Sequence, residues 1–499
     1  MTHLLKTFFV VALLSLEFAS AAEPARHLFL DPAFLSESHG VALRVNPAER
    51  REAVIRPDRP WEKLMISLFL TVLDETDAAG NKTLRMWYIC RDADNVPNVA
   101  YAESTDGTTW TKPNLGIVDY HGSTENNLVG LSSLEGTVFR DPHARPGAEY
   151  VYITNLKQDG LFRFYSPDGL RWQRDAEPLF RFRPDTQNVT FWDERLEKYV
   201  LYTRSWIPHD DWTKRLRKVS RAELDDLTKP VELKPSGLAA KNPKNPAEPP
   251  RFTTELPTVL APDEKDPPNS DVYNSSVQPY PLDTRWYVGF PSWFLRENSL
   301  INGRLETHFM GSRDGVKWER YDRAPYAPLG TAGSDAANMT FLCPNLVVRG
   351  DELWQYGPTF RTHHGDVAAR KQQSDGTIHR WVQRVDGFVA AEFDSTTLKE
   401  GEARCTTTPV LVEGPQLRLN LDTGALGGLR VGLLDEASKP LPGFGLDECR
   451  ELHTNDVRAG VRWQDRDDLA SLVGKQVRLT FAGSRTKLFS FYFTADEAK

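Results

Sequence analysis

Runs in which apolar and polar residues alternate recur along most of the chain. Two such runs are 98–102 and 161–165, and a period of two is typical of β-strands with one buried face. Further strand-like runs occur at 65–73, 84–90, 150–153, 198–202, 285–290 and 352–357. The pattern predicts an all-β protein built from many short strands.

A turn pattern follows three of these runs: Ser, any residue, Asp, Gly, two further residues and Trp. It occupies 104–110, 166–172 and 312–318, and 386–388 looks like a decayed fourth copy. Asp-Gly favours a tight turn with positive φ at Gly, and the Ser and Asp side chains can bond turn amides. The Trp is expected to open the return strand and to pack over the turn. The pattern therefore predicts outer hairpins and gives their aspartates a structural role.

The spacing of these turns predicts the architecture. Asp106 and Asp168 are 62 residues apart, Asp168 and Asp314 are 146 apart, or two units of 73, and Asp314 and Asp386 are 72 apart. A repeat of this length, with several short strands in each unit, fits radially arranged sheets with loop insertions. We expect the missing copy near 220–226, where the motif has degenerated. The sequence thus predicts a five-bladed β-propeller.

The propeller is expected to cover 27–395, with a lead-in strand within 27–60 that helps to close the ring. Residues 233–270 are rich in Pro, Lys and Asp and predict a long insertion loop. After about residue 395 the alternation continues without the turn motif. This change predicts a separate C-terminal β-sandwich over 410–495.

Residues 1–21 have the features of a secretory signal peptide. Lys6 precedes an apolar run at 8–16, and Ala19-Ser20-Ala21 is a small-residue cleavage site. The apolar run is too short to cross a bilayer. The sequence therefore predicts a secreted or periplasmic protein.

Charge and cysteine content narrow the possible partners. The net charge is −8 over 499 residues and no basic run stands out, which argues against nucleic acid and anionic membranes. Export permits disulfides, so Cys405 with Cys449 and Cys90 with Cys343 are possible pairs, and four buried free thiols are the alternative. Spacings this wide do not indicate a metal site, and no cofactor is predicted, although a central metal ion stays open.

The candidate chemistry consists of polar residues just before the first strand of each blade. In a propeller these strands line the central channel, and their starting ends open on one face. The blades then offer the carboxylates Glu62, Asp141, Asp185, Asp271 and Asp335. Like charges held together need raised pKa values or a cationic partner. A glycosidase uses such a setting, with one carboxyl protonated as acid and another ionised as base or nucleophile.

We predict four of these carboxylates to be catalytic: Glu62, Asp141, Asp185 and Asp271. Each also has a structural alternative, as the cap of a turn or the start of a strand. The residues predicted to contact substrate are Arg140, Asn188, Tyr273, Asp335, Arg361, His363 and His364.

At this point the chain resembles the five-bladed glycosidases of the invertase and fructanase family (glycoside hydrolase family 32) and the related arabinosidase and xylosidase family (family 43). The resemblance rests on the blade count, the Ser-x-Asp-Gly-x-x-Trp hairpins, Arg140-Asp141-Pro142 and the trailing sandwich. It implies that Asp141 steadies the transition state. The catalytic motifs diverge, because Trp61-Glu62 stands where the invertases have Asn-Asp-Pro, and Asp185 stands where a blade-three Glu is expected.

The function predicted from the sequence is therefore a secreted glycoside hydrolase acting on oligo- or polysaccharides. A propeller that binds a glycan without cutting it is the alternative, which the divergent catalytic motifs keep open. A glycoside phosphorylase is a second alternative, since Arg361, His363 and His364 can hold an anion.

Overall fold

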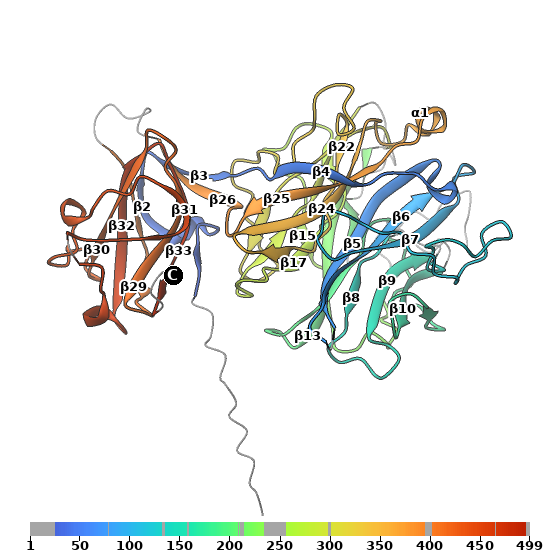
Figure 1. Cartoon of the computed structure of the whole chain (residues 1–499), viewed down its shortest axis with the longest axis horizontal. Coiled ribbons are helices and arrows are strands. Elements are labelled where there is room, and N and C mark those ends of the chain that lie inside the picture. The colour runs from blue at the N-terminus through green and yellow to red at the C-terminus, as the bar shows by residue number, and fades with distance from the viewer. Residues whose placement is uncertain are drawn as a thin grey trace, which may run out of the picture.

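The computed structural model describes residues 25–77, 79–131, 135–156, 159–207, 209, 214–233, 256–297, 301–394, 402–464 and 466–495. Strands dominate, and α1 (Val367–Gln372) is the one α-helix in these ranges (Figure 1). The prediction of an all-β protein is confirmed. No helix within these ranges is long and apolar enough to cross a membrane. The predicted signal peptide lies outside the described residues, as does much of the predicted insertion loop.

Three consecutive antiparallel sheets follow the short 3-10 helix η2 (Pro60–Glu62), and in each of them neighbouring strands pair in chain order. The first contains β5 (Met65–Thr76), β6 (Lys82–Arg91) and β7 (Pro97–Ser104). The second contains β8 (Val138–Arg140), β9 (Tyr150–Leu156), β10 (Gly160–Ser166) and β11 (Gln173–Arg174). The third contains β12 (Val189–Asp193), β13 (Lys198–Ile207), β14 (Leu216–Leu224) and β15 (Thr258–Leu260).

The next strands form a larger, interrupted arrangement. A three-stranded sheet contains β17 (Val277–Pro279), β18 (Tyr287–Gly289) and β21 (Met310–Ser312). An eight-stranded sheet contains β16 (Ser270–Val272), β19 (Ser292–Arg296), β20 (Gly303–Thr307), β22 (Met339–Thr340), β23 (Val347–Arg349), β24 (Glu352–Phe360), β25 (Thr377–Arg384) and β4 (Glu49–Ile55). One parallel contact, Leu305 with Met339, joins its two halves. The edge strand β4 comes from the N-terminal region and pairs with β25.

The three Ser-x-Asp-Gly-x-x-Trp turns have the same geometry. In the second copy, Gly169 has φ +73 and its N–H donates to the Ser166 hydroxyl at 2.9 Å. The Asp168 carboxylate accepts the N–H groups of Leu170 and Arg171, both at 2.8 Å. The copies at 104–110 and 312–318 repeat these bonds. The predicted structural role of the turn aspartates agrees with this geometry.

Each turn also fastens its sheet to a neighbouring one. The Gly169 carbonyl accepts the indole N–H of Trp87 on β6 at 2.6 Å. Aromatic hydroxyls on β13 and β24 cap the other two turn glycines in the same way, Tyr202 on Gly315 at 2.7 Å and Tyr356 on Gly107 at 2.8 Å. Side chains at these glycines have no room, because a Cβ on Gly169 would lie 2.8 Å from the Trp87 ring.

Hydrogen bonds between residues in or next to the first strands link these sheets in turn. The linked pairs are Thr71 with Val138, Thr137 with Asn188, Gln187 with Asn274, Ser276 with Leu342 and Asn345 with Val72. The last pair returns to β5, so the contacts close a circuit. The starting ends of β8 and β12 lie together, since Gly136 pairs in parallel with Asn188. We call this end of the first strands the mouth.

The C-terminal strands form two further sheets, drawn in orange and red at the left of Figure 1. One contains β26 (Val389–Phe393), β29 (Gln416–Asp422), β31 (Asn455–Gly460) and β33 (Thr486–Thr494), together with β1 (His27–Leu28) and β3 (Val41–Val45). The other contains β27 (Ala403–Thr407), β28 (Val410–Leu411), β30 (Gly428–Leu434) and β32 (Gln476–Ser484), together with β2 (Leu35–His39). Buried residues of both sheets share one apolar cluster.

The pairing of the N-terminal strands differs from the expected lead-in. Strands β1, β2 and β3 pair with C-terminal strands, and not with the sheets of 49–384. The strand that joins the eight-stranded sheet is β4, which also lies within 27–60. Alternation alone does not identify a strand's partner, which explains the difference. All four cysteines are buried and free, as in the second of the two alternatives.

Candidate active site

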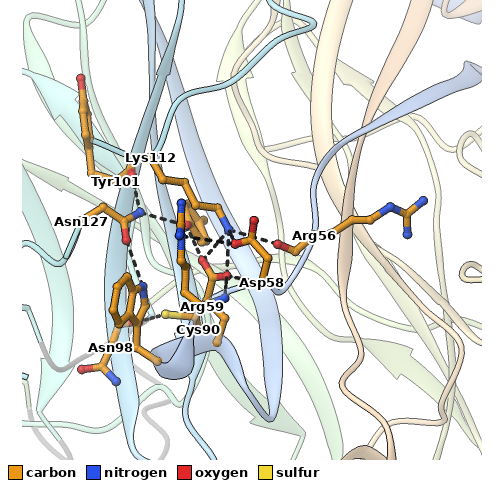
Figure 2. Close-up of polar contacts among 11 residues, drawn as sticks. Arg56, Asp58, Arg59, Cys90, Asn98, Tyr101, Lys112 and Asn127 are labelled. Atoms are coloured by element: carbon orange, nitrogen blue, oxygen red, sulfur yellow. Dashed lines mark hydrogen bonds and ion pairs between the residues drawn. The ribbon is translucent and has the colours of Figure 1, made fainter. Parts of the chain in front are cut away.

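Glu62 is buried in an ion-pair network away from open surface. Its side chain is fully buried, and its carboxylate accepts the Tyr88 hydroxyl at 2.6 Å and the Lys112 ammonium at 2.8 Å. Figure 2 shows Lys112 also bonded to Asp58 and to the backbone oxygen of Arg56. The network ties the segment before β5 to β6. A carboxylate held in this way has a structural role, so the structure does not support the expected catalytic role of Glu62.

Asp141 lies at the far end of β8 from the mouth. The channel-side strand starts near Glu135 and ends at Arg140, so the Arg-Asp-Pro motif follows the strand instead of preceding it. Six positions separate Glu135 from Asp141, or roughly 20 Å of extended chain. Asp141 accepts the Tyr199 hydroxyl at 2.8 Å, and the Arg140 guanidinium lies 5.6 Å from the centre of the Tyr150 ring. The expected meeting of Asp141, Asp185 and Glu62 is therefore not observed.

Asp185 does lie at the mouth, just before β12. It is partly exposed and forms ion pairs with Arg183 at 3.4 Å and Arg204 at 3.9 Å. Its φ of +57 is rare outside glycine and costs conformational energy. Asn188, three residues on, is fully buried and bonds the Glu135 carbonyl and the Thr203 hydroxyl. Asn188 thus holds two first strands together and does not face an open site.

A second acid at the mouth is Glu135, which the sequence analysis did not select. Glu135 directly precedes Gly136 at the start of the β8 segment, and the Asn155 amide donates to its carboxylate. Burial and the nearby Asp185 carboxylate raise the pKa of Glu135 to about 7, against the opposing effect of Arg183 and Arg204. The mouth therefore holds one carboxyl that is partly protonated at neutral pH beside another that is paired with arginine.

Asp271 lies beneath the mouth in a buried ion cluster. Its fully buried carboxylate accepts the Arg217 N–H at 2.8 Å and pairs with the guanidinium groups of Arg217 and Arg296. These bonds join β16 to β14 and β19. Asp271 compensates buried positive charge, and its carboxylate is occupied by these partners, so the structure gives it a positioning role and not the predicted catalytic one.

Tyr273 and His364 meet at the mouth, as two of the residues predicted to contact substrate. The His364 Nδ1 lies 2.7 Å from the Ile301 carbonyl, and its Nε2 lies 2.8 Å from the Tyr273 hydroxyl. Burial and the neighbouring arginines lower the pKa of His364 to about 4. The imidazole is therefore neutral near pH 7: Nδ1–H donates to the carbonyl, and Nε2 accepts the Tyr273 proton.

Arginines surround Tyr273 on its other side. The guanidinium groups of Arg204 and Arg217 lie 4.6 and 5.2 Å from the centre of its ring. Arg204 also donates to the backbone oxygens of Asp185 and Tyr273, which fixes the start of β12 against the strand beside it. Burial and Arg217 lower the pKa of Arg204. The described residues thus place several guanidinium groups around the two carboxyls of the mouth.

Two further predicted substrate residues border a separate cleft, and His363 is not among its lining residues. Asp335 and Arg361 line an open cavity of about 730 Å³ beside the start of β5. Asp335 pairs with His379 at 3.0 Å, and His363 pairs with Glu297 at 3.0 Å. The described residues contain no group of three or more His, Cys, Asp or Glu side chains that could hold a metal ion.

The sequence does carry a signal for Glu135. It is the polar residue before the run that starts at Thr137, the kind of position where site residues are expected. The Arg-Asp-Pro motif led instead to the prediction that Asp141 is the catalytic carboxylate of this unit. Arg204 and Arg217 carry no sequence signal of this kind, because they lie at the end of β13 and the start of β14 and reach the mouth only through sheet packing.

No family model matches the sequence, and no curated protein sequence matches it. Similar solved structures include a glycoside hydrolase family 43 arabinoxylan arabinofuranohydrolase from Bacillus subtilis, with 11% identity, 87% of this chain and 96% of that chain covered, and a TM-score of 0.37. A family 32 β-fructofuranosidase from Bombyx mori has 8% identity, covers 94% of this chain and 96% of that chain, and has a TM-score of 0.40.

An N-acetylgalactosamine deacetylase from F. plautii is similar at the same level, with 12% identity, 70% of this chain and 97% of that chain covered, and a TM-score of 0.43. Two of these proteins belong to the families that the sequence resembles, and the third has a different activity by its name. Likenesses this distant do not fix a reaction. Evidence that this protein catalyses a reaction must therefore come from the side chains at the mouth.

Proposed function

We propose that the chain is an exported glycosidase, built as a five-bladed propeller with an appended β-sandwich. The closed circuit of hydrogen bonds between first strands supports the blade count, because each link joins one unit to the next and the last returns to β5. The two C-terminal sheets around one apolar cluster support the sandwich. Export rests on the sequence of residues 1–21 and is tested by the N-terminus of the mature protein.

The pair Glu135 and Asp185 carries the proposed chemistry. Glycoside hydrolysis needs one carboxyl that is protonated at the working pH and a second that is ionised. Burial and the Asp185 charge hold the pKa of Glu135 near 7, while Asp185 forms ion pairs with Arg183 and Arg204. The two environments thus assign the roles: Glu135 is the general acid, and Asp185 is the base or nucleophile.

In the proposed reaction Glu135 donates its proton to the glycosidic oxygen as the bond from that oxygen to the anomeric carbon breaks. Positive charge then develops on the sugar ring beside the Asp185 carboxylate. Asp185 either takes a proton from a water that bonds the anomeric carbon, or bonds that carbon itself. In the second route the Glu135 carboxylate then takes a proton from a water that displaces Asp185, and the anomer of the product distinguishes the routes. Arg204 positions Asp185 through its backbone oxygen, and His364 orients the Tyr273 hydroxyl.

The test is product release from a panel of polysaccharides by the mature protein and three matched variants. Glu135→Gln and Asp185→Asn each keep shape and remove a proton donor or a charge, and we expect kcat to fall by about 10²–10⁴-fold. Asp141→Asn is the control, because Asp141 lies at the other end of β8, and we expect full activity.

Loss of activity in Asp141→Asn with retention in Glu135→Gln would overturn the assignment in favour of the one that the resemblance implies. Binding of a glycan by the wild-type protein without any product release would instead identify a binding module. Calorimetry on the same panel separates this outcome from a missing substrate.

A further inference from the structure

The cleft of about 730 Å³ beside the start of β5 has a net positive lining. Its charged side chains are four cations and two carboxylates: Arg56, Lys63, Arg361, Lys371, Asp335 and Asp375. The lining therefore keeps a positive charge even when both carboxylates are ionised. A concave surface lined by one sign of charge concentrates the opposite ion from solution.

The Asp335 carboxylate is held by cations of the protein itself. It lies 3.0 Å from the His379 ring nitrogen, 3.5 Å from the Arg50 guanidinium and 3.9 Å from the Arg56 guanidinium. His379 and Arg50 are not among the lining residues. Asp335 and Arg56 therefore compensate each other, and the remaining cations of the cleft need another partner.

The Asp375 carboxylate is occupied by backbone groups. It accepts the N–H groups of Arg361, Thr362 and Gly376 at 3.1, 2.8 and 2.9 Å. The Arg361 guanidinium donates to the Ser374 carbonyl at 3.3 Å and forms no ion pair within the described ranges. Asp375 thus fixes the chain at Arg361 without pairing with its side chain.

Lys63 and Lys371 add two further positive charges to the same cleft. Both residues are exposed, and neither ammonium group has a hydrogen-bond or ion-pair partner in the part of the chain that the structure describes. Guanidinium and ammonium groups bind the oxygens of carboxylates, sulfates and phosphates. Together with Arg361, these lysines are three cations that can engage one oxyanion.

The rest of the lining suits a ligand with hydroxyl groups. The side-chain amides of Gln372 and Gln373 face the cleft and have no partner among the described residues. An amide both donates and accepts hydrogen bonds, as a hydroxyl does. The cavity volume of about 730 Å³ falls within the range of about 300–1,000 Å³ that is typical of small-molecule sites, and it exceeds what one inorganic anion fills.

The wall that carries these groups is fixed in place. The Ile66 N–H donates to the Asp375 carbonyl at 3.0 Å, and the Asp375 N–H donates to the Leu64 carbonyl at 3.3 Å. The next residue, Gly376, has φ +85, and a Cβ there would lie 2.1 Å from the Ile66 oxygen. A preformed wall of this kind lowers the entropic cost of binding.

A second cavity, of about 530 Å³, adjoins the cleft and has a different lining. The two share four residues, Pro57, Lys63, Ala93 and Ser374. The second cavity adds three carboxylates, those of Asp58, Asp92 and Asp94, and one further cation, Arg59. The positive lining is therefore confined to the first cavity and is not a general property of this surface.

We propose that the cleft is a binding site for an acidic saccharide, whose carboxylate or sulfate group is bound by Lys63, Lys371 and Arg361 and whose hydroxyl groups are bound by Gln372 and Gln373. The site is separate from the mouth and goes beyond the proposed function. It binds its ligand whether or not the mouth hydrolyses a glycan.

The experiment measures binding to the full mature chain by calorimetry. The probes are trigalacturonate and its neutral methyl ester, a sulfated carrageenan tetrasaccharide and its desulfated form, and inorganic sulfate. We expect one acidic saccharide to bind at least tenfold more tightly than both its neutral form and inorganic sulfate, and its affinity to fall as salt is raised. The two saccharide pairs distinguish carboxylate from sulfate recognition.

Paired substitutions locate the bound anion. Lys63→Gln with Lys371→Gln removes the two ammonium groups, and we expect Kd for the acidic saccharide to rise at least tenfold. Lys439→Gln with Lys475→Gln is the matched control, because it removes the same charge from two exposed positions outside the cleft and should bind as before. Equal binding by the two double variants would overturn the site.

A third variant separates a saccharide site from an anion site. Gln372→Ala with Gln373→Ala should weaken the acidic saccharide about tenfold and leave the binding of inorganic sulfate unchanged. Inorganic sulfate that binds as tightly as both acidic saccharides would overturn the saccharide and leave a site for free anions. Binding of neither acidic saccharide more tightly than its neutral form would overturn the proposal as a whole.

Failure at the cleft and failure at the mouth are distinguishable. Glu135→Gln should bind the acidic saccharide as the wild-type chain does, because Glu135 is not among the lining residues. Loss of this binding in Glu135→Gln would move the ligand to the mouth and overturn the cleft site. Absence of hydrolysis of every glycan tested would overturn the glycosidase, and the binding measured at the cleft would still support this site.

Discussion

Carboxylates occupy two contrasting settings in this protein, the repeated turns and the mouth. In the turn, Asp168 accepts two backbone N–H groups at 2.8 Å each and is partly exposed, and these bonds hold its pKa below the ordinary value. At the mouth, burial and Asp185 raise the pKa of Glu135 to about 7. The same chemical group is thus held ionised in one place and partly protonated in the other.

The contrast shows that the repeated turns and the mouth have different roles, the first in stability and the second in the proposed reaction. Each copy of the turn closes a hairpin and fastens it to a neighbouring sheet, as Gly169 does with Trp87. This shared structural role explains why the turn recurs. The mouth does not repeat: the units contribute Glu135, Asp185 and Tyr273 at corresponding places. Different side chains at equivalent positions are what a site with an acid, a base and a binding group requires.

The largest expected effect that tests this contrast is on the pH dependence of activity. A general acid must be protonated, so kcat/KM should fall about tenfold per pH unit above the Glu135 pKa of about 7, or roughly 100-fold by pH 9. Residual activity of Glu135→Gln should lack this decline. A wild-type profile that stays flat to pH 9 on a substrate with a poor leaving group would contradict the role of Glu135.

A turn glycine gives the next largest effect, on stability alone. In Gly169→Ala the new Cβ would lie 2.8 Å from the Trp87 ring at φ +73, so we expect a loss of about 2–4 kcal/mol from backbone strain and overpacking. Gly147→Ala is the matched control, with φ +86 and open space around it, and should cost only about 1 kcal/mol. Urea unfolding measures both.

Activity per folded molecule should stay unchanged in both glycine variants, because neither residue approaches the mouth. Equal destabilisation by the two substitutions would mean that the turn does not fasten adjacent sheets. Loss of activity in the folded fraction of Gly169→Ala would show that the turns and the mouth are coupled.

The sequence predicted what local patterns determine and missed what packing determines. Alternation and the Asp-Gly turns predicted the strands and the structural role of Asp168, because a turn is encoded in its own seven residues. Asp185 was placed correctly at a strand start. Glu62 and Asp141 were misplaced, since a buried partner such as Lys112, or the exact start of β8, depends on residues far along the chain. Arg217 reaches the mouth only through contacts between sheets, which no local pattern records.

The smallest expected effect distinguishes the two settings by the sign of their pH dependence. Asp168→Asn keeps an oxygen that can accept both turn N–H groups but loses the charge, so at pH 7 we expect a loss of about 0.5–1 kcal/mol, limited by solvent exposure. The folded pKa of Asp168 is lowered from 3.8, so this contribution is complete above that value and disappears as the pH falls through the folded pKa. The stability of the variant and that of the wild type should therefore converge as the pH falls below 3.8.

Glu135→Gln should show the opposite sign. Its folded pKa is raised from 4.5 to about 7, so the wild-type chain loses stability as the pH rises between these values, and the Gln variant does not. The difference in unfolding free energy between variant and wild type should then grow with pH from about 4.5 to 7 for Glu135→Gln. For Asp168→Asn the change should be confined to lower pH. Parallel curves for the two variants would remove the contrast between turn and mouth, because both carboxyls would then have the same environment.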